Sequence, residues 1–190
     1  MEKKVIVETS ARHIHLSREH VDILFGAGHA LTNKKDLSQP GQFACEEKVE
    51  LVGAKGSLKV SVLGPERKST QVELSYTDAR VLGLKDVPVR ESGDVAGTPG
   101  CKLVGPCGEL EIAEGCIIAM RHIHFDTATA DAMGIKDKQI VKVKIASGRT
   151  TIFDDVVCRV SDSYAPAMHI DTDECNAAAA FGVVYGEIVD

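Results

Sequence analysis

Short runs of β-branched and aliphatic residues recur along the chain, and several of them alternate with polar positions. The run at residues 48–52 reads KVELV, and the run at residues 57–62 reads SLKVSV. This period of two is typical of half-buried strands. Further strand-like runs lie at residues 5–7, 116–119 and 140–145. Because glycine and proline separate these runs closely, the pattern predicts a mainly β protein with short helices, built as small β-barrels.

Helices are predicted where a capping residue precedes a short amphipathic run and a glycine follows it. Ser17 and Asp126 are N-cap residues of this kind, and Gly26 and Gly134 are expected to end the helices. The predicted helices are residues 18–25 and 127–133. Two other places have an N-cap residue with an acidic residue three positions later, which is the spacing of a capping box. These pairs are Ser75 with Asp78 and Asp171 with Glu174.

The chain contains an internal duplication. The tetrapeptide Arg-His-Ile-His occurs at residues 12–15 and again at 121–124, 109 positions later and again just before a predicted helix. Residues 72–79 and 168–175 form a second matching pair, 96 positions apart. The glycine- and proline-rich segment 91–108 is interpreted as the connection between the copies. The predicted domains are a first β-barrel repeat at residues 12–110 and a second β-barrel repeat at residues 111–190.

The duplicated motif suggests metal binding. In an extended chain residues i and i+2 point the same way, so each His-Ile-His motif presents two imidazoles on one face. Glu73 and His169 occupy equivalent positions in the two copies and offer one further ligand each. Imidazole and carboxylate are common zinc ligands, and six of them suit two ions with open positions. The candidate metal ligands are His13, His15, Glu73, His122, His124 and His169.

Three arginines stand close to these groups in the sequence. Arg67 lies in a polar loop just before a predicted strand, and an arginine beside a metal can grip phosphate through forked, charge-assisted hydrogen bonds. A solvated turn is the alternative interpretation of this loop. Arg12 and Arg121 each precede the first histidine of a motif, where an arginine either binds an anion or forms a plain ion pair.

Composition excludes several classes of function. The chain has 190 residues with 22 basic and 28 acidic side chains, a net charge of −6, and no cluster of Lys or Arg. We therefore expect no nucleic-acid binding, because such affinity comes mainly from neutralised phosphates. No run approaches the roughly 18 apolar residues of a membrane span, so no membrane association is expected.

The remaining histidines and the cysteines are assigned no chemical role. His20 and His29 are isolated and are interpreted as helix-surface and loop residues. No Cys-x-x-Cys pair occurs, and the thiols are expected to be small apolar side chains rather than disulfides or ligands. The cysteines are Cys45, Cys101, Cys107, Cys116, Cys158 and Cys175.

Five segments carry a resemblance to a known family. They are residues 10–17 (SARHIHLS), 70–73 (TQVE), 97–100 (GTPG), 121–124 (RHIH) and 169–174 (HIDTDE). Together they resemble the PduL-type phosphotransacylases, the phosphate propanoyltransferases of propanediol degradation. The resemblance runs from about residue 4 to the end of the chain.

This resemblance implies two small β-barrels with a dinuclear zinc site at their junction. The N-terminal strand, within residues 1–11, would pair into the second barrel. The implied ligand sets are His13, His15 and His169 for one zinc, and His122, His124 and Glu73 for the other. Arg67 matches the phosphate-contacting arginine of the family.

The implied activity is a reversible phosphate acyltransferase reaction, in which a short acyl-CoA and inorganic phosphate give acyl phosphate and CoA. We expect a propanoyl or acetyl group and direct attack of phosphate on the thioester, assisted by two Zn²⁺ per chain. The absence of a nucleophile motif agrees with direct transfer. Two alternatives stay open, a dinuclear zinc hydrolase and a non-catalytic, zinc-stapled structural module.

Location and assembly are also expectations from the resemblance. Many family members carry an amphipathic N-terminal extension that packages them into a bacterial microcompartment, whereas here only Met1, Glu2, Lys3 and Lys4 precede the first predicted strand. We therefore expect a free cytoplasmic bacterial enzyme, with association with a microcompartment through a partner as the alternative. A homodimer is the expected assembly.

Overall fold

The structure is a computed structural model that describes residues 3–189. Residues 1, 2 and 190, which the predicted segments include, lie outside the described residues. The chain forms two compact units. The described residues of the first, here called the barrel unit, are 3–10, 38–40 and 120–189, and the second, here called the sheet unit, consists of residues 11–37 and 41–119.

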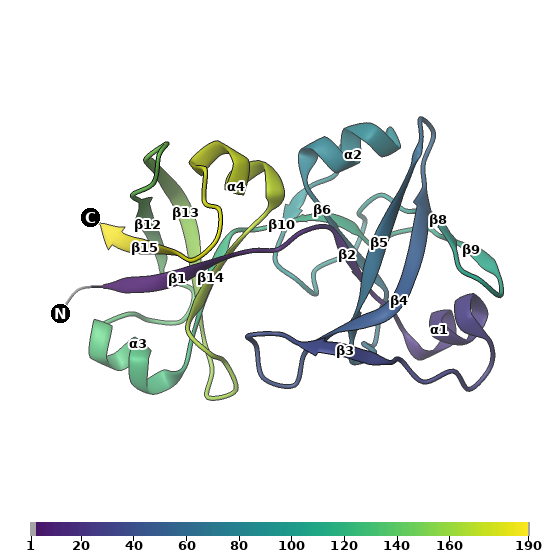
Figure 1. Ribbon diagram of the computed structural model, residues 1–190, viewed down its shortest axis with the longest axis horizontal. Helices are drawn as coiled ribbons and strands as arrows, with labels where there is room; N and C mark the ends of the chain where they lie inside the picture. Colours follow the sequence, from purple (N-terminus) through teal and green to yellow (C-terminus); the bar gives the residue numbers. More distant parts are fainter. Residues whose placement is uncertain (1–2, 190) are drawn as a thin grey trace. The chain divides into compact units, whose positions relative to one another are not determined.

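Fifteen strands and four short helices make up the described chain (Figure 1). The strands are β1 (Lys4–Thr9), β2 (His13–His15), β3 (Asn33–Asp36), β4 (Phe43–Val52), β5 (Ser57–Gly64), β6 (Gln71–Leu74), β7 (Val89–Arg90), β8 (Cys101–Val104), β9 (Glu109–Ile112), β10 (Cys116–Ala119), β11 (His122–Phe125), β12 (Ile140–Ile145), β13 (Thr151–Val160), β14 (Ala167–Ile170) and β15 (Val184–Val189). The helices are α1 (Arg18–Phe25), α2 (Tyr76–Leu82), α3 (Thr127–Met133) and α4 (Thr172–Ala178). The predicted class, mainly β with short helices, is confirmed.

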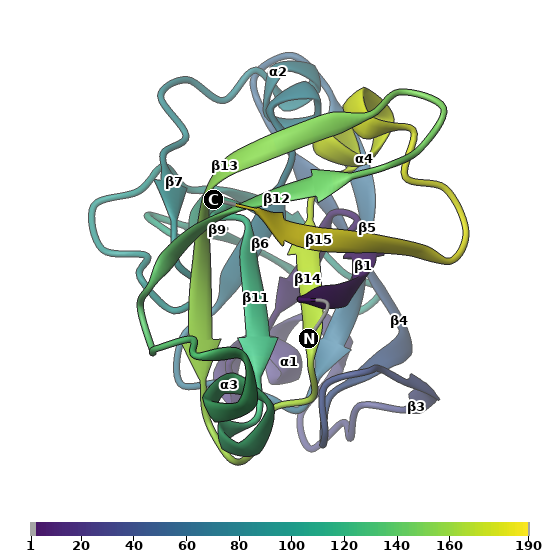
Figure 2. The same cartoon turned by 90° about the vertical axis from the view of Figure 1, so that its left-hand side faces the viewer.

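Six strands close the barrel of the barrel unit in the order β1-β14-β11-β13-β12-β15 (Figure 2). The N-terminal strand β1 runs parallel to β14 and antiparallel to β15. Gly186 of β15 faces the barrel interior, where a Cβ would come within 2.5 Å of the Val143 side chain. Alternate residues of β12 point inward, so Val141, Val143 and Ile145 join the barrel core.

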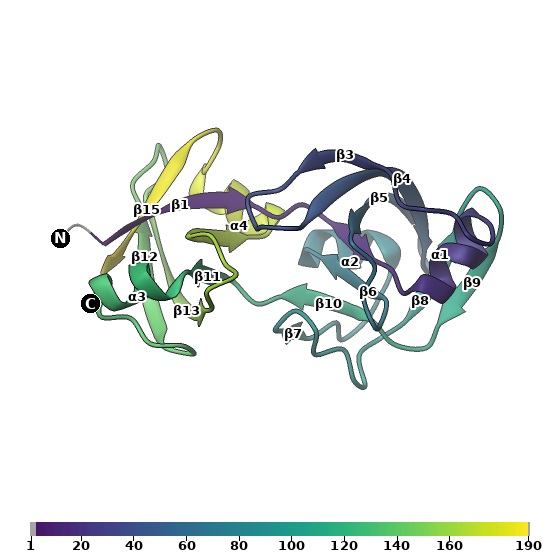
Figure 3. The ribbon, with the colours of Figure 1, turned by 90° about the horizontal axis from the view of Figure 1, so that it is seen from below.

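The sheet unit has a nine-stranded sheet that follows an open path, β7-β10-β6-β2-β5-β4-β8-β9, with β3 added beside β4. It is a half-barrel rather than the second closed barrel that the duplication predicts. Figure 3 shows the long strands β4 and β5 side by side. Aliphatic residues of both strands join the core of this unit, and α1 packs beside β9. The barrel has six strands, whereas this sheet has nine and stays open.

The segment between the predicted repeats is not a linker. Strand β8, which lies within residues 91–108, pairs with both β4 and β9. Farther along the chain, β10 pairs in parallel with β6 and β7. The predicted boundary at 110/111 is corrected accordingly, because residues 111–119 belong to the sheet unit. The glycines mark close backbone approach: a Cβ on Gly100 would lie 1.7 Å from the Ile112 carbonyl oxygen, and one on Gly105 would lie 2.4 Å from that of Leu24.

The helix predictions are confirmed at both ends. Ser17 caps α1 by accepting from the His20 amide, and Asp126 caps α3 by accepting from the Thr129 amide. The helices α2 and α4 each begin with a complete capping box. None of the helices in the described part of the chain is long and apolar enough to cross a membrane.

The longest strand of the barrel unit was not predicted from the sequence. Strand β13 contains two consecutive aspartates, Asp154 and Asp155, which interrupt its apolar pattern. Asp155 has a positive φ of 53°, and the pairing of β13 with β12 shifts register at this point. The pair therefore forms a bulge, which hides the strand period from the sequence.

Candidate metal centres

The sheet unit brings three ligand-type side chains together. Strand β2 carries His13 and His15, and its antiparallel neighbour β6 places Glu73 directly opposite His13. The ring centroids of the two histidines are 5.0 Å apart, and His13 Nε2 lies 3.4 Å from Glu73 Oε2. All three side chains are buried, and one ligand atom from each lies within 4.8 Å of the others. We call this set the sheet-unit triad.

The barrel unit repeats the arrangement. Strand β11 carries His122 and His124, and its antiparallel neighbour β14 places His169 directly opposite His122. The ring centroids of His122 and His124 are 4.6 Å apart, and His169 lies 5.1 Å from the former and 5.0 Å from the latter. Their ligand atoms also fall within 4.8 Å of one another. We call this set the barrel-unit triad.

The ligand sets differ from those that the resemblance implies. The crossed arrangement would give His169 to the first histidine pair and Glu73 to the second. In the structure each pair clusters with the third group of its own unit, so that prediction is corrected. The reason is strand pairing. Strand β6, which carries Glu73, is the hydrogen-bonded neighbour of β2, and β14, which carries His169, is the hydrogen-bonded neighbour of β11.

The hydrogen bonds of the first histidine in each triad suit metal binding. The Nδ1–H of His13 donates to the Ala11 carbonyl oxygen at 2.8 Å, and that of His122 donates to the Met120 carbonyl oxygen at the same distance. Because a carbonyl oxygen only accepts, each Nδ1 carries a proton, and Nε2 is the nitrogen left to face a metal ion. Metal-ligating histidines almost always have such a second hydrogen bond, which fixes the tautomer and the ring orientation.

The second histidine of each motif also fits a metal ligand. His15 Nδ1 donates to the Leu63 carbonyl oxygen at 3.2 Å. His124 Nδ1 is buried and has no hydrogen-bond partner among residues 3–189. A buried, unsatisfied nitrogen is costly unless some group satisfies it, and a metal ion beside three converging ligands does so. The residues present therefore fit one divalent ion in each triad.

Charge inside the sheet-unit triad couples His13 to Glu73. Burial opposes protonation of His13, but the carboxylate of Glu73 outweighs it and raises the pKa of the imidazole. For Glu73, burial favours the neutral acid. The charge of His13 and the hydrogen bond between the two side chains outweigh burial and lower the pKa of Glu73 far below its ordinary value. The carboxylate is thus ionised and able to bind a cation.

The second histidines are held neutral. Burial, followed by the charges of His13 and Arg67, lowers the pKa of His15 to about 3. Burial, followed by the charges of His122 and His169, lowers the pKa of His124 to about 2. Neutral imidazole is the form that binds metal, so both side chains are in the ligating state at neutral pH.

Arg67 is linked to the sheet-unit triad through one serine. Its Nη1 donates to Ser92 Oγ at 3.1 Å, and the same hydroxyl donates to Glu73 Oε1 at 3.0 Å. The Gln71 side-chain amide also donates to Glu73 Oε1, at 2.6 Å, and Gln71 Oε1 accepts from the Gly93 amide at 2.6 Å. One carboxylate oxygen is therefore fixed by the protein while Oε2 faces His13.

Ser92 and Gln71 were not predicted from the sequence. Gln71 lies two positions before Glu73 on the same face of β6, so its spacing offered a signal. Ser92 lies in a loop that is far from Glu73 in sequence, and no local pattern connects the two residues.

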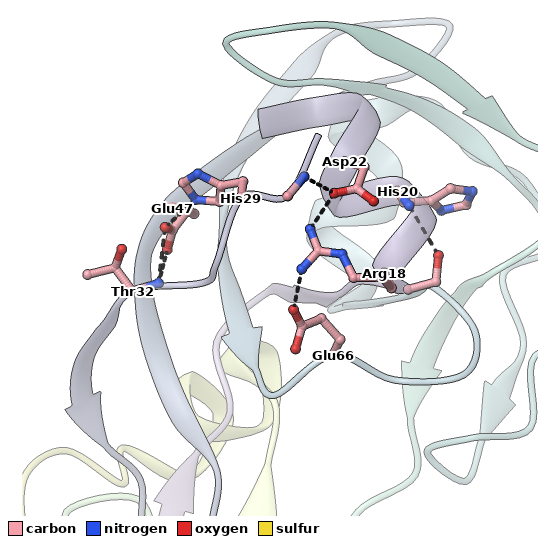
Figure 4. A network of polar contacts seen from close by, with 9 residues as sticks. Arg18, His20, Asp22, His29, Thr32, Glu47 and Glu66 are labelled. Carbon is pink, nitrogen blue, oxygen red and sulfur yellow. Dashed lines mark hydrogen bonds and ion pairs between the residues drawn. The ribbon is translucent and has the colours of Figure 1, made fainter. Parts of the chain in front are cut away.

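Helix α1 is bonded to the loop that carries Arg67. Arg18 donates to Glu66 at 2.8 Å and to Asp22 at 2.7 Å, as Figure 4 shows. The Arg67 amide donates to the Leu16 carbonyl oxygen at 2.9 Å. This loop is therefore anchored at its backbone rather than being a freely solvated turn.

The two isolated histidines lie in the same unit and in neither triad. His20 Nδ1 lies 2.7 Å from the Thr70 hydroxyl. His29 pairs with the buried carboxylate of Glu47 at 2.8 Å, also visible in Figure 4.

Around the barrel-unit triad the neighbours are different. The Tyr164 ring lies 4.2 Å from that of His124, measured between centroids. Arg159 is the register partner of His124 on β13, and its Nη2 donates to the Tyr164 hydroxyl at 3.3 Å. Neither residue was predicted from the sequence, because Arg159 comes beside His124 only when β13 pairs with β11 and Tyr164 lies in the loop that follows β13.

All six cysteines are free thiols, and five of them are buried. Cys107 is the exposed one. No cysteine joins either triad within the described chain.

Comparison with known proteins gives one consistent result. Residues 6–181 match the model of the family described as phosphate propanoyltransferase. The phosphate propanoyltransferase of Listeria monocytogenes is 50% identical over 190 residues, covering 100% of this chain and 89% of that protein. Those of Clostridioides difficile and Thermotoga maritima are each 54% identical, over 172 and 179 residues, covering 90% and 93% of this chain and 82% and 85% of theirs. The resemblance found in the motifs is confirmed, and the chain is a member of the phosphate propanoyltransferase family of enzymes.

Proposed function

We propose that the chain transfers a propanoyl or acetyl group from CoA to inorganic phosphate, reversibly, with one zinc ion in each triad. The observation that carries this proposal is the pair of three-ligand clusters at equivalent registers. Structural zinc sites are filled by four protein ligands, whereas catalytic sites have three and keep a position open for a reactant. Two open sites suit a reaction that joins two negatively charged reactants.

Arg67 is proposed as the phosphate-binding residue. Its guanidinium presents several donors in a plane, and this matches the oxygens of phosphate. It lies close enough to the sheet-unit triad for its charge to lower the pKa of His15. Ser92 holds one of its nitrogens, which restricts the orientation of the guanidinium. An attacking phosphate would thus be bound beside the triad.

The triad residues orient the site and keep it ready for a cation. Each first histidine is held by a carbonyl two residues earlier, and Glu73 is held by Gln71 and Ser92. When bound, zinc supplies a Lewis acid that polarises the thioester carbonyl and stabilises the charge that develops on the oxygen and on the leaving thiolate. We assign no side chain as a nucleophile, since phosphate attacks the thioester directly.

The test is a measurement of CoA release from propanoyl-CoA and acetyl-CoA, with and without phosphate, on protein of known metal content. We expect phosphate-dependent release, acyl phosphate as the product and about two zincs per chain, in line with two three-ligand sites. Release that is independent of phosphate would indicate a zinc hydrolase instead. Bound zinc with no turnover of either thioester would indicate a zinc-stapled structural module. The homodimer and the cytoplasmic location stay predictions.

A further inference from the structure

The arginine before each His-Ile-His motif makes the same ion pair in both units. Arg12 Nη1 lies 3.1 Å from Asp78 Oδ1, and Arg121 Nε lies 2.8 Å from Glu174 Oε1. Asp78 and Glu174 are the N3 residues of the capping boxes that begin α2 and α4. The duplication has therefore preserved a contact between residues that are 66 positions apart in one copy and 53 in the other.

In both units the two carboxylate oxygens divide their partners in the same way. Asp78 Oδ2 accepts from the Ser75 amide at 3.3 Å, and Glu174 Oε2 accepts from the Asp171 amide at 3.0 Å. The other oxygen of each is the one that faces the arginine. The pair keeps this geometry although one acid is aspartate and the other glutamate, so the arginine contact is a repeated feature of the fold.

The position of this contact relates it to the metal ligands. Each arginine is bonded through the peptide chain to the first histidine of its triad. The N-cap residue of each helix lies two residues after the third ligand, since Ser75 follows Glu73 and Asp171 follows His169 at that spacing. In the sheet unit the ion pair therefore connects the end of β2 with the end of β6, the strands on which His13 lies opposite Glu73. In the barrel unit it connects the ends of β11 and β14, on which His122 lies opposite His169.

We propose that Arg12 and Arg121 are positioning residues, each of which sets the geometry of the metal triad in its own unit. This inference rests on the proposed function, because it requires metal in the triads. Metal ligands must sit within about 0.2 Å of ideal distances, so a small shear between the two strands weakens binding. In each arginine one guanidinium nitrogen makes this ion pair with the acid of the helix cap.

A purely stabilising role explains less. The side chains of Arg12 and Arg121 are 40% and 33% exposed, and ion pairs of such exposure contribute little to the free energy of unfolding. Their acidic partners are mostly buried, at 8% and 18%, and already have a partner in the helix cap. What the arginine adds is a fixed link between the histidine strand and the helix that follows the third ligand.

The experiment measures zinc affinity one site at a time, by competition with a chromophoric chelator. In a His13→Ala background only the barrel-unit triad can bind, and there Arg121→Met should weaken binding by roughly tenfold while Arg12→Met leaves it unchanged. In a His122→Ala background the roles should be exchanged. Lys102→Met, which breaks an exposed ion pair with Glu109 in the sheet unit, is the matched control and should change neither affinity.

Second variants keep the test decisive if an arginine variant folds poorly. Asp78→Asn and Glu174→Gln keep an oxygen for the helix cap but remove the charge that faces the arginine, and they should reproduce the same site-specific loss. Arg12→Lys and Arg121→Lys should recover part of the affinity. Losses that appear equally in both units, or affinities within twofold of the parent in all four variants, would overturn the proposal while leaving zinc-dependent transfer intact. Failure of the unmodified chain to bind zinc would overturn both.

Discussion

The two triads share a backbone plan and differ in chemistry. In the sheet unit the third group is the carboxylate of Glu73, whereas in the barrel unit it is the imidazole of His169, at the same register opposite the first histidine. A divalent ion in the first set has its charge partly neutralised, while one in the second set keeps it in full. The second ion would be the stronger Lewis acid, since neutral imidazole ligands leave its charge uncompensated.

The surroundings increase this difference. All three members of the sheet-unit triad are buried, and Gln71, Ser92 and Arg67 form a polar network next to them. In the barrel-unit triad His122 and His169 are only half-buried, and the Tyr164 ring lies against His124. Duplication has thus preserved the geometry that gathers three ligands, while substitution of single residues gave each copy its own charge and neighbours.

The strongest test of this comparison removes one ligand from each triad. His13→Ala and His122→Ala should each lower the zinc content from about two ions per chain to about one, and activity should fall by roughly a thousandfold or more because each site has only three protein ligands. Elemental analysis and thioester turnover check both expectations. Full activity after exhaustive chelation would contradict the role of either site.

The second test concerns Arg67, which is linked through Ser92 to the sheet-unit triad. Arg67→Ala should raise the phosphate KM or lower kcat by roughly a hundredfold, because a lost charge-assisted hydrogen bond costs about 3 kcal/mol. Arg67→Lys keeps the charge without the forked geometry and should show an intermediate defect. Kinetics with phosphate and acyl-CoA varied in turn, together with metal analysis, separate the roles.

For Arg67 the zinc content is the control and should stay at the parental level. Unchanged phosphate kinetics in Arg67→Ala, or a loss of zinc, would mean that the residue supports the loop instead of binding phosphate.

A third test uses the hydrogen bonds that fix Glu73 in the sheet-unit triad. Gln71→Met removes the amide that donates to Glu73 and should weaken zinc binding at that triad by about tenfold, with no change at the barrel-unit triad. Chelator competition in the His122→Ala background measures the affected site, and the His13→Ala background measures the other. Equal losses at both sites would indicate a general loss of fold.

The smallest effects are expected from the thiols, which belong to neither triad. Cys101→Ser, Cys107→Ser and Cys175→Ser should each leave turnover within roughly tenfold, a barrier change of about 1.4 kcal/mol. Steady-state rates check this, and mass spectrometry of protein quenched during turnover checks for a covalent acyl group. An acyl-thioester on any of these residues would rule out direct attack by phosphate.

Local signals in the sequence were sufficient for the helices and for the list of triad residues. Ser17 and Gly26 mark the two ends of α1, and Asp126 and Gly134 mark those of α3. Such ends can be predicted because capping depends on contacts within a few residues. The repeated tetrapeptide indicated the duplication in the same way. By contrast, β13 was missed because its bulge at Asp155 breaks the strand period.

Long-range pairing decided the rest. The sequence determined that two histidine pairs and two equivalent third groups exist, because residue type and spacing are written in the chain. Only the tertiary structure decided that Glu73 clusters with His13 and that His169 clusters with His122, since the clustering depends on which strands become hydrogen-bonded neighbours. The same holds for Ser92, which reaches Glu73 across a fold whose strand order bears no simple relation to the order along the chain. Strand order depends on how much apolar surface the whole sheet buries, and no local sequence pattern carries that information.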